Sequence, residues 1–221
     1  MNLATIDYRL ERLINAPAGH LPVVDTLMVA AASWAEVVFA AVVVVWFLFG
    51  MIRVSRREKL GAVTALLAAG GALLVNLVLS HLYFHSRPFV AHPGVVHLLL
   101  NHARDNSFPS DHAAGAFAVS VVLVAYRRRL GVVAIVASAW VAYARVYVGD
   151  HYPLDVLVGA ADGIIAAILL LTILRVLPTV VAGAADHILV AVHLQPRRAL
   201  DALVVKDSAQ STDLGEGEQG E

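Results

Sequence analysis

The chain has 221 residues, of which 59% are hydrophobic and only 15% are charged, and its formal net charge is −1. Soluble domains carry about 25% charged residues, so this composition excludes an ordinary soluble domain and predicts an integral membrane protein. The absence of cysteine excludes disulfides, thiol chemistry and thiolate metal sites.

The N-terminal segment, residues 1–26, is predicted to lie in the membrane interface. Its apolar residues fall on one face of a helix over 3–16, and its charged residues fall on the other. The apolar positions are Leu3, Ile6, Leu10, Leu13 and Ile14. This pattern is typical of interfacial anchors, with a plain surface helix as the alternative.

Five apolar runs follow, and each is long enough, or nearly so, to cross a bilayer, which takes about 17–25 residues. They occupy 27–50, 60–80, 111–126, 130–148 and 154–177. Strands are not expected at this depth, because their backbone groups would be unpaired in lipid. Residues 27–177 are therefore predicted to form an all-α bundle of five transmembrane helices.

The C-terminal part divides into two segments. Residues 178–206 fit an amphipathic or membrane-associated helix, and a sixth crossing is the alternative. Asp186, His187 and His193 disfavour a crossing, because charge is costly in lipid. Residues 207–221 hold acidic side chains and no basic ones, which predicts a disordered acidic tail.

Basic residues predict the orientation in the membrane. They follow the first, third and fifth apolar runs, as Arg53, Arg56, Arg57, Lys59, Arg127, Arg128, Arg129, Arg175, Arg197, Arg198 and Lys206. The positive-inside rule places these loops in the cytoplasm. The N-terminus and the loops 81–110 and 149–153 are then expected on the outer face.

The most informative polar segment lies between the fourth and fifth runs and contains Arg145, His151 and Asp155. An arginine can hold a phosphate bidentately, a histidine can attack phosphorus, and an aspartate can fix the tautomer of that histidine. A polar turn with a capping aspartate is the simpler interpretation. It gives no reason, however, for an arginine in the last turn of an apolar run.

Two other polar segments are predicted on the same face. The Arg87-Pro88 pair ends the second run and directs its arginine into the outer loop. Ser110 suits the N-cap of the third helix, where the backbone N–H of Asp111 and its successors would form an anion site. The Ser110 hydroxyl can donate to the same anion, and His112 can protonate a leaving oxygen.

Together these segments resemble the signature of the type 2 phosphatidic acid phosphatase superfamily, which reads Lys-x6-Arg-Pro, Pro-Ser-x-His and Ser-Arg-x5-His-x3-Asp. The matching residues are Arg87, Pro88, Pro109, Ser110, His112, Arg145, His151 and Asp155. The resemblance spans roughly residues 80–165, and it is strongest to the bacitracin-resistance type of undecaprenyl-diphosphatase.

This resemblance implies an enzyme that hydrolyses undecaprenyl diphosphate to undecaprenyl phosphate and phosphate. It would act on the outer face of a bacterial plasma membrane, in the peptidoglycan pathway of cell-wall biogenesis. The substrate is a lipid phosphate, and neither a nucleic-acid partner nor a cofactor is expected. A phosphatase of phosphatidic acid or of phosphatidylglycerol phosphate is the enzymatic alternative.

The resemblance also implies roles for the site residues. His151 would become phosphohistidine, Asp155 would orient it, and His112 would protonate the leaving group. Arg87 and Arg145, with Ser110, Asp111 and backbone N–H groups of the third helix, would hold the phosphate oxygens. The arginines and the helix terminus would supply the positive field, so no metal is implied.

Two positions depart from the family pattern. The family lysine falls on Ser80, and the serine before the second arginine is Ala144. A substitute cation is therefore expected near the phosphate, with Arg104 as the first choice and protonated His81 or His85 as alternatives. The same two histidines could form a helix-borne metal pair, which is the less favoured interpretation.

Glu36 and Asp162 are ionisable residues inside apolar runs. Such residues usually pair with a partner or face a cavity, so a structural pairing with Asn76 and a role near the lipid pocket are both open. From a different class, a small proton-linked transporter could use these carboxylates and the loop histidines. Gly159 and Gly163 fit a face of close helix packing.

Overall fold

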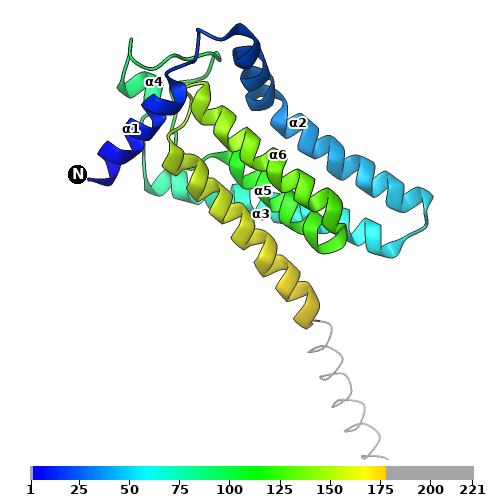
Figure 1. Ribbon diagram of the computed structural model, residues 1–221. Helices are drawn as coiled ribbons and strands as arrows, with labels where there is room; N and C mark the ends of the chain where they lie inside the picture. The colour runs from blue at the N-terminus through cyan, green and yellow to red at the C-terminus, as the bar shows by residue number, and fades with distance from the viewer. Residues whose placement is uncertain (1, 178–221) are drawn as a thin grey trace, which may run out of the picture. The chain divides into compact units, whose positions relative to one another are not determined.

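The computed structural model describes residues 2–177, which fold as helices joined by turns and one long loop (Figure 1). The helices are α1 (Leu3–Asn15), α2 (Pro22–Ile52), α3 (Arg56–Leu82), α4 (Pro88–Ala91), α5 (Asp111–Tyr126), α6 (Arg128–Tyr147) and a last helix over Pro153–Leu177. Within the described range there is no strand beyond an isolated bridge between Ser86 and Asn106. The all-α prediction is confirmed, whereas the predictions for 178–206 and 207–221 lie outside the described residues.

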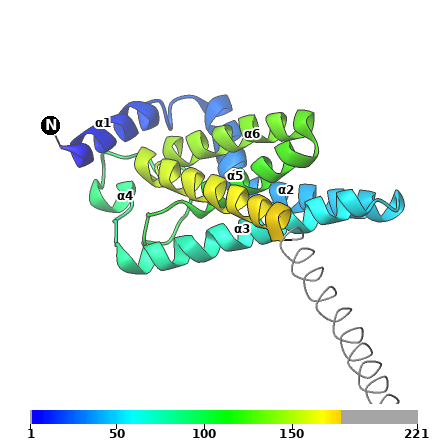
Figure 2. The ribbon, with the colours of Figure 1, turned by 90° about the horizontal axis from the view of Figure 1, so that it is seen from below.

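Four helices are long and apolar enough to cross a membrane, namely α2, α3, α6 and the helix Pro153–Leu177. The remaining apolar helix, α5, has 16 residues. It lies between α3 and α6 in both views and packs against each of them (Figure 2). All five predicted apolar runs are therefore helical, and the chain is a multi-pass membrane protein.

Small residues form the contacts between the helices. On α3, Ala62, Ala65, Ala68 and Ala72 are buried on one face, because their spacing of three or four matches the helical repeat. A Cβ on Gly163 of the last helix would lie 2.1 Å from the carbonyl oxygen of Ala114 on α5. Close backbone approach of this kind is typical of helices packed in lipid.

The basic turns meet at one end of the bundle. Arg57 Nη2 donates to the carbonyl oxygen of Tyr126 at 2.8 Å, and Arg127 Nε donates to Glu58 at 2.8 Å. Trp46 Nε1 donates to the same carboxylate at 2.5 Å. These bonds tie the α2–α3 turn to the α5–α6 turn, so the predicted cytoplasmic loops lie together.

The first helix, α1, turns its polar face inward. Asp7, Glu11 and Asn15 are buried, whereas Leu3, Leu10 and Leu13 are exposed. Asp7 Oδ1 accepts a bond from the backbone N–H of Leu154 at 2.9 Å, near the start of the last helix. Asn15 Nδ2 donates to the carbonyl oxygen of Tyr147 at 2.8 Å. α1 therefore braces the turn that carries His151 and Asp155.

Candidate active site

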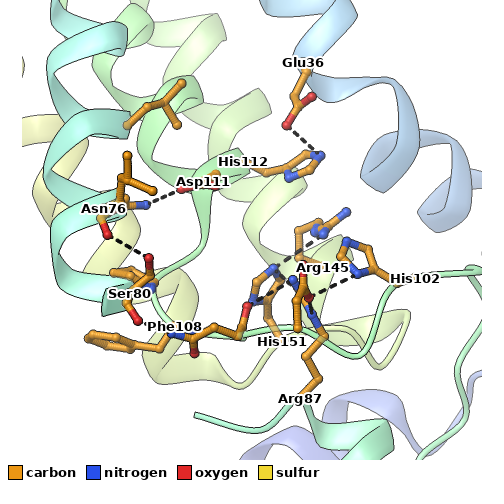
Figure 3. A pocket seen from close by; sticks show the side chains of 15 residues that line it. Glu36, Asn76, Ser80, Arg87, His102, Phe108, Asp111, His112, Arg145 and His151 are labelled. Carbon is orange, nitrogen blue, oxygen red and sulfur yellow. Dashed lines mark hydrogen bonds and ion pairs between the residues drawn. The ribbon is translucent and has the colours of Figure 1, made fainter. Parts of the chain in front are cut away.

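The three polar segments meet around one cavity (Figure 3). The cavity lies at the start of α5, and the basic turn lies at the other end of that helix, after Tyr126. The cavity has a volume of about 590 Å³. Its polar lining residues are Glu36, Asn76, Ser80, Arg87, His102, Asp105, Asn106, Asp111, His112, Arg145 and His151. Residues separated by more than a hundred positions thus share a single polar space.

His151 is the buried centre of this space, and its two ring nitrogens face different surroundings. Nε2 lies 3.4 Å from Arg87 Nη1 and 3.4 Å from Arg145 Nη2. Nδ1 lies 3.3 Å from Ser107 Oγ and 3.7 Å from Asp155 Oδ2. Nε2 therefore faces the two arginines and also their partner Asp150, whose Oδ2 lies 3.5 Å away, while Nδ1 faces Ser107 and Asp155.

Asp155 opens the last helix and is fully buried. Its Oδ2 accepts bonds from Ser107 Oγ at 2.5 Å and from the backbone N–H of Tyr152 at 3.0 Å. Its Oδ1 lies 3.1 Å from Nδ1 of His85, whose ring stacks on Tyr152 with centroids 4.7 Å apart. The carboxylate is thus fixed between two histidines, His85 and His151.

The two arginines are both buried and share one partner, the buried carboxylate of Asp150. Arg145 Nη2 donates to Asp150 Oδ2, and Arg87 Nη1 lies 3.0 Å from Asp150 Oδ1. Arg87 Nε also donates to Asp105 at 2.6 Å. Arg145 Nη1 donates to the carbonyl oxygen of Ala32 on α2 at 3.2 Å. The guanidinium groups are therefore held in place from several elements.

The start of α5 supplies the rest of the predicted site. Ser110 occupies the N-cap as expected, but its buried Oγ makes no capping bond and has no hydrogen-bond partner among residues 2–177. Asp111 accepts a bond from Asn76 Nδ2 at 2.9 Å, and His112 Nε2 lies 3.4 Å from Glu36 Oε1. Asn76 therefore pairs with Asp111, and among residues 2–177 no hydrogen bond joins it to Glu36 or Asp162, the two carboxylates for which it was an open partner.

Arg104 does not reach the cavity. It is exposed and absent from the cavity lining, whereas His102, Asp105 and Asn106 of the same loop do line it. Asn106 Nδ2 donates to the carbonyl oxygen of Ser80 at 2.8 Å. This bond holds the loop against the end of α3, and Arg104 is exposed on the outside of the loop. The expectation that Arg104 substitutes for the family lysine is therefore not supported.

The alternative cations are placed differently as well. Ser80 lines the cavity at the position of the family lysine. His81 is exposed and its Nδ1 lies 2.7 Å from the carbonyl oxygen of Leu77, while His85 faces Asp155. Ala144 is fully buried. The only arginines on the cavity wall within residues 2–177 are Arg87 and Arg145.

Burial and neighbouring charges set the protonation of the two histidines beside Asp155. Burial lowers the pKa of His151, and the nearby Asp155 carboxylate only partly opposes this effect. A lowered pKa keeps this imidazole neutral, which is its nucleophilic form. The hydrogen bond to Asp155 raises the pKa of His85, with burial opposing it. His85 therefore favours the protonated state that pairs with Asp155.

An apolar groove adjoins the polar cavity. It has a volume of about 390 Å³ and is lined by residues of α2, α3 and α5. Glu36, Leu73, Asp111 and His112 line both spaces, so they mark the junction. A lipid ligand could therefore place its polar head in the cavity and its apolar tail in the groove.

Comparison with known proteins agrees with this arrangement. Residues 60–177, more than half of the chain, match the family described as the PAP2 superfamily. The chain belongs to the PAP2 superfamily. Undecaprenyl-diphosphatase BcrC from Bacillus subtilis (strain 168) is 34% identical over 152 residues, which cover 69% of this chain and 76% of that protein.

Two solved structures share the fold. LpxE from Aquifex aeolicus matches with a TM-score of 0.62 and 29% identity, covering 74% of this chain and 93% of that one. The PAP2-type phosphatidylglycerolphosphate phosphatase from Bacillus subtilis matches with a TM-score of 0.63 and 22% identity, covering 78% and 86%. The predicted membrane phosphatase class is confirmed, and the transporter alternative is set aside.

Three residues of this PAP2 site are not singled out by the sequence patterns. Ser107 lies two residues before Pro109, Asp150 lies within the third motif just before His151, and His102 lies in the loop before α5. In the sequence, their nearness to motif residues is the feature that could have marked them as site residues. Their contacts depend on how the loop 83–110 folds back over the turn 148–152, which no local pattern predicts.

Proposed function

We propose that this PAP2 phosphatase hydrolyses undecaprenyl diphosphate to undecaprenyl phosphate and inorganic phosphate. The observation that carries the proposal is the placement of His151 Nε2 at 3.4 Å from both Arg87 and Arg145, beside an apolar groove. The BcrC relative, which bears the name undecaprenyl-diphosphatase, supports the choice of lipid diphosphate. The groove provides a space for an isoprenoid chain.

The proposed reaction has two steps. His151 Nε2 attacks the terminal phosphorus, the bond to the leaving oxygen breaks, and His112 donates a proton to that oxygen. Asp155 stabilises the charge that forms on the His151 ring. Arg87 and Arg145 stabilise the equatorial phosphate oxygens, where charge gathers in the transition state.

In the second step, water attacks the phosphohistidine. His112 takes a proton from this water, the phosphorus–nitrogen bond breaks, and phosphate leaves. Ser110 and the backbone N–H groups at the start of α5 would contact the same phosphate oxygens, and the unpaired Ser110 hydroxyl supports this role. Asp111 contributes its N–H, since its carboxylate accepts a bond from Asn76.

The enzyme would work at the outer face of a bacterial plasma membrane. The cavity lies at the opposite end of the bundle from the basic turns, which the positive-inside rule assigns to the cytoplasm. Release of undecaprenyl phosphate at that face would return the lipid carrier to cell-wall synthesis.

Phosphate release by the purified protein tests this function. Undecaprenyl diphosphate should be hydrolysed faster than phosphatidic acid or phosphatidylglycerol phosphate. His151→Ala should reduce the rate by about 10³-fold or more, because the covalent step is lost, while Arg104→Ala serves as the matched control with unchanged kinetics. Near-normal turnover by His151→Ala would refute the mechanism, and a preference for the monoesters would refute the substrate.

A further inference from the structure

Glu36 is the only ionisable residue between Leu27 and Ile52, which form most of the apolar helix α2. Its side chain is 67% exposed, and its Oε1 lies 3.4 Å from His112 Nε2 (Figure 3). An exposed carboxylate in a membrane-spanning helix is costly and usually has a functional partner. The facing histidine is that partner.

The position of this pair in the cavity is specific. Glu36 and His112 line both the polar cavity and the apolar groove, so they stand where one space passes into the other. A lipid phosphate that places its head in the cavity and its tail in the groove has its leaving oxygen at this junction. His151 approaches from the arginine side of the same cavity.

Charges around His112 decide whether it can act as an acid. The other charged or titratable groups near its ring are Arg145 from α6, Asp150 and His151 from the following turn, and His102 from the loop before α5. Asp111 adjoins it on α5 and is bonded to Asn76. Burial of the ring is the largest effect that opposes an imidazolium, and the charge of Arg145 adds to it, while Asp150 is already paired with both arginines. Glu36 is the carboxylate in direct contact with the ring.

We infer that Glu36 is a positioning residue for the leaving-group acid: its carboxylate orients His112 toward the scissile bond and offsets part of the cost of forming the imidazolium in this buried place. This inference rests on the proposed function. With Nε2–H directed to Glu36, the imidazolium gives its Nδ1 proton to the leaving oxygen, and the water of the second step returns a proton to Nδ1.

The leaving group provides the test. Glu36→Gln should lower kcat/KM, which reports the first step alone, about tenfold to a hundredfold on an alkyl monophosphate, whose alkoxide needs a proton, since general acid catalysis is worth about 10²–10⁴-fold. On 4-nitrophenyl phosphate, whose leaving group needs no proton, kcat/KM should change less than about twofold. Asp162→Asn, at another carboxylate within an apolar helix, is the matched control and should change neither rate.

Two further measurements separate this role from a structural one. The alkaline limb of the wild-type rate profile on the alkyl substrate should move to lower pH in Glu36→Gln, because loss of the carboxylate disfavours the imidazolium. Glu36→Gln combined with His112→Ala should be no slower than His112→Ala alone. Equal losses on both probes, or additive losses in the double variant, would overturn the inference.

This inference can fail while the proposed function stands, as when the wild-type protein hydrolyses undecaprenyl diphosphate but Glu36→Gln is slowed equally on both probes. A wild-type protein that releases phosphate from both probes, with Glu36→Gln slowed only on the alkyl substrate, supports the role of Glu36. A wild-type protein that releases none from the probes or from undecaprenyl diphosphate overturns the proposed function, and the inference with it.

Discussion

Asp150 shows how a single buried residue can tune the phosphate site. Its carboxylate is fully buried and lies against both arginines, so it occupies part of the charge field that a phosphate would use. A bound phosphate and Asp150 therefore compete for the same guanidinium groups. Asp150 pairs with both arginines and so keeps their guanidinium groups oriented.

Asp150→Asn should therefore bind inorganic phosphate and vanadate about tenfold more tightly. A tenfold change in affinity corresponds to roughly 1.4 kcal/mol, which is the size expected for the loss of one competing charge interaction. Without phosphate the variant should melt at a lower temperature, because two buried cations lose their partner, and added phosphate should restore its stability. Inhibition constants and thermal melts measure both effects.

Asp105→Asn is the control for this prediction. Asp105 contacts Arg87 but is 57% exposed, so its loss should change phosphate inhibition less than twofold. Weaker phosphate binding by Asp150→Asn would show that Asp150 assists phosphate binding instead of competing with it.

Glu11 makes a second prediction at the residue scale. It is fully buried on α1, and its carboxylate oxygens have no hydrogen-bond partner among the described residues. Burial raises the pKa of Glu11 to about 7. In the unfolded chain the same carboxyl ionises near pH 4.5. Burial of Glu11 therefore costs more free energy of folding as the pH rises above 4.5. The stability that the neutral carboxyl contributes is lost once the pH passes the folded-state pKa of about 7.

Glu11→Gln should therefore raise the melting temperature at pH 8 by about 2–4 °C, the shift that 1 kcal/mol produces in a domain of this size. At pH 4.5 the two proteins should melt within about a degree of each other, because the wild-type carboxyl is then largely neutral. A variant that is less stable at both pH values would show that the glutamate has a bonding role.

At the scale of elements, a single substitution can fill the groove between α2, α3 and α5. Gly115 lines this groove, and a Cβ built on it meets no atom within 4 Å. Gly70 on α3 also has open space around its Cβ but lines neither the groove nor the polar cavity. The two glycines form a matched pair for testing the groove.

Gly115→Leu should lower kcat/KM for undecaprenyl diphosphate about tenfold or more, since the new side chain occupies the proposed tail space. It should leave 4-nitrophenyl phosphate hydrolysis nearly unchanged. Gly70→Leu should affect neither substrate. Equal activity of Gly115→Leu on the long-chain lipid would place the lipid tail elsewhere.

The helix packing that holds the site together depends on other glycines. Gly159 and Gly163 bring the last helix close enough to α5 that an added Cβ would collide with backbone oxygens of Ser110 and Ala114. The helix with Asp155 and the helix with His112 are thereby kept in contact. The predicted packing face is thus supported by the structure.

At the scale of the whole molecule, the charge distribution predicts the topology. Reporter fusions after Lys59 and after Arg129 should give a cytoplasmic signal, and a fusion near Asn101 should give an external one, because basic loops remain inside. A cytoplasmic signal at Asn101 would place the active site at the inner face. It would contradict the proposed recycling of the carrier at the outer face.

The sequence by itself determined the helices and the chemistry of the motifs. Apolar runs long enough for a bilayer leave the backbone no alternative but helices, and proline and serine at the ends of runs fixed where α5 begins. Arg145, His151 and Asp155 lie close together in sequence, at the end of α6, in the turn that follows and at the start of the last helix, so their proximity follows from local spacing alone. For these features no long-range contact was needed.

Only the tertiary structure decided which distant side chains complete the site. Asp150, Ser107 and His85 contact motif residues because the loop before α5 folds over the turn after α6. The same fold turns Arg104 outward and brings Glu36 of α2 to His112. These contacts depend on the relative positions of packed helices, which a helical repeat leaves undefined, because it specifies which face is apolar but not which neighbour covers it.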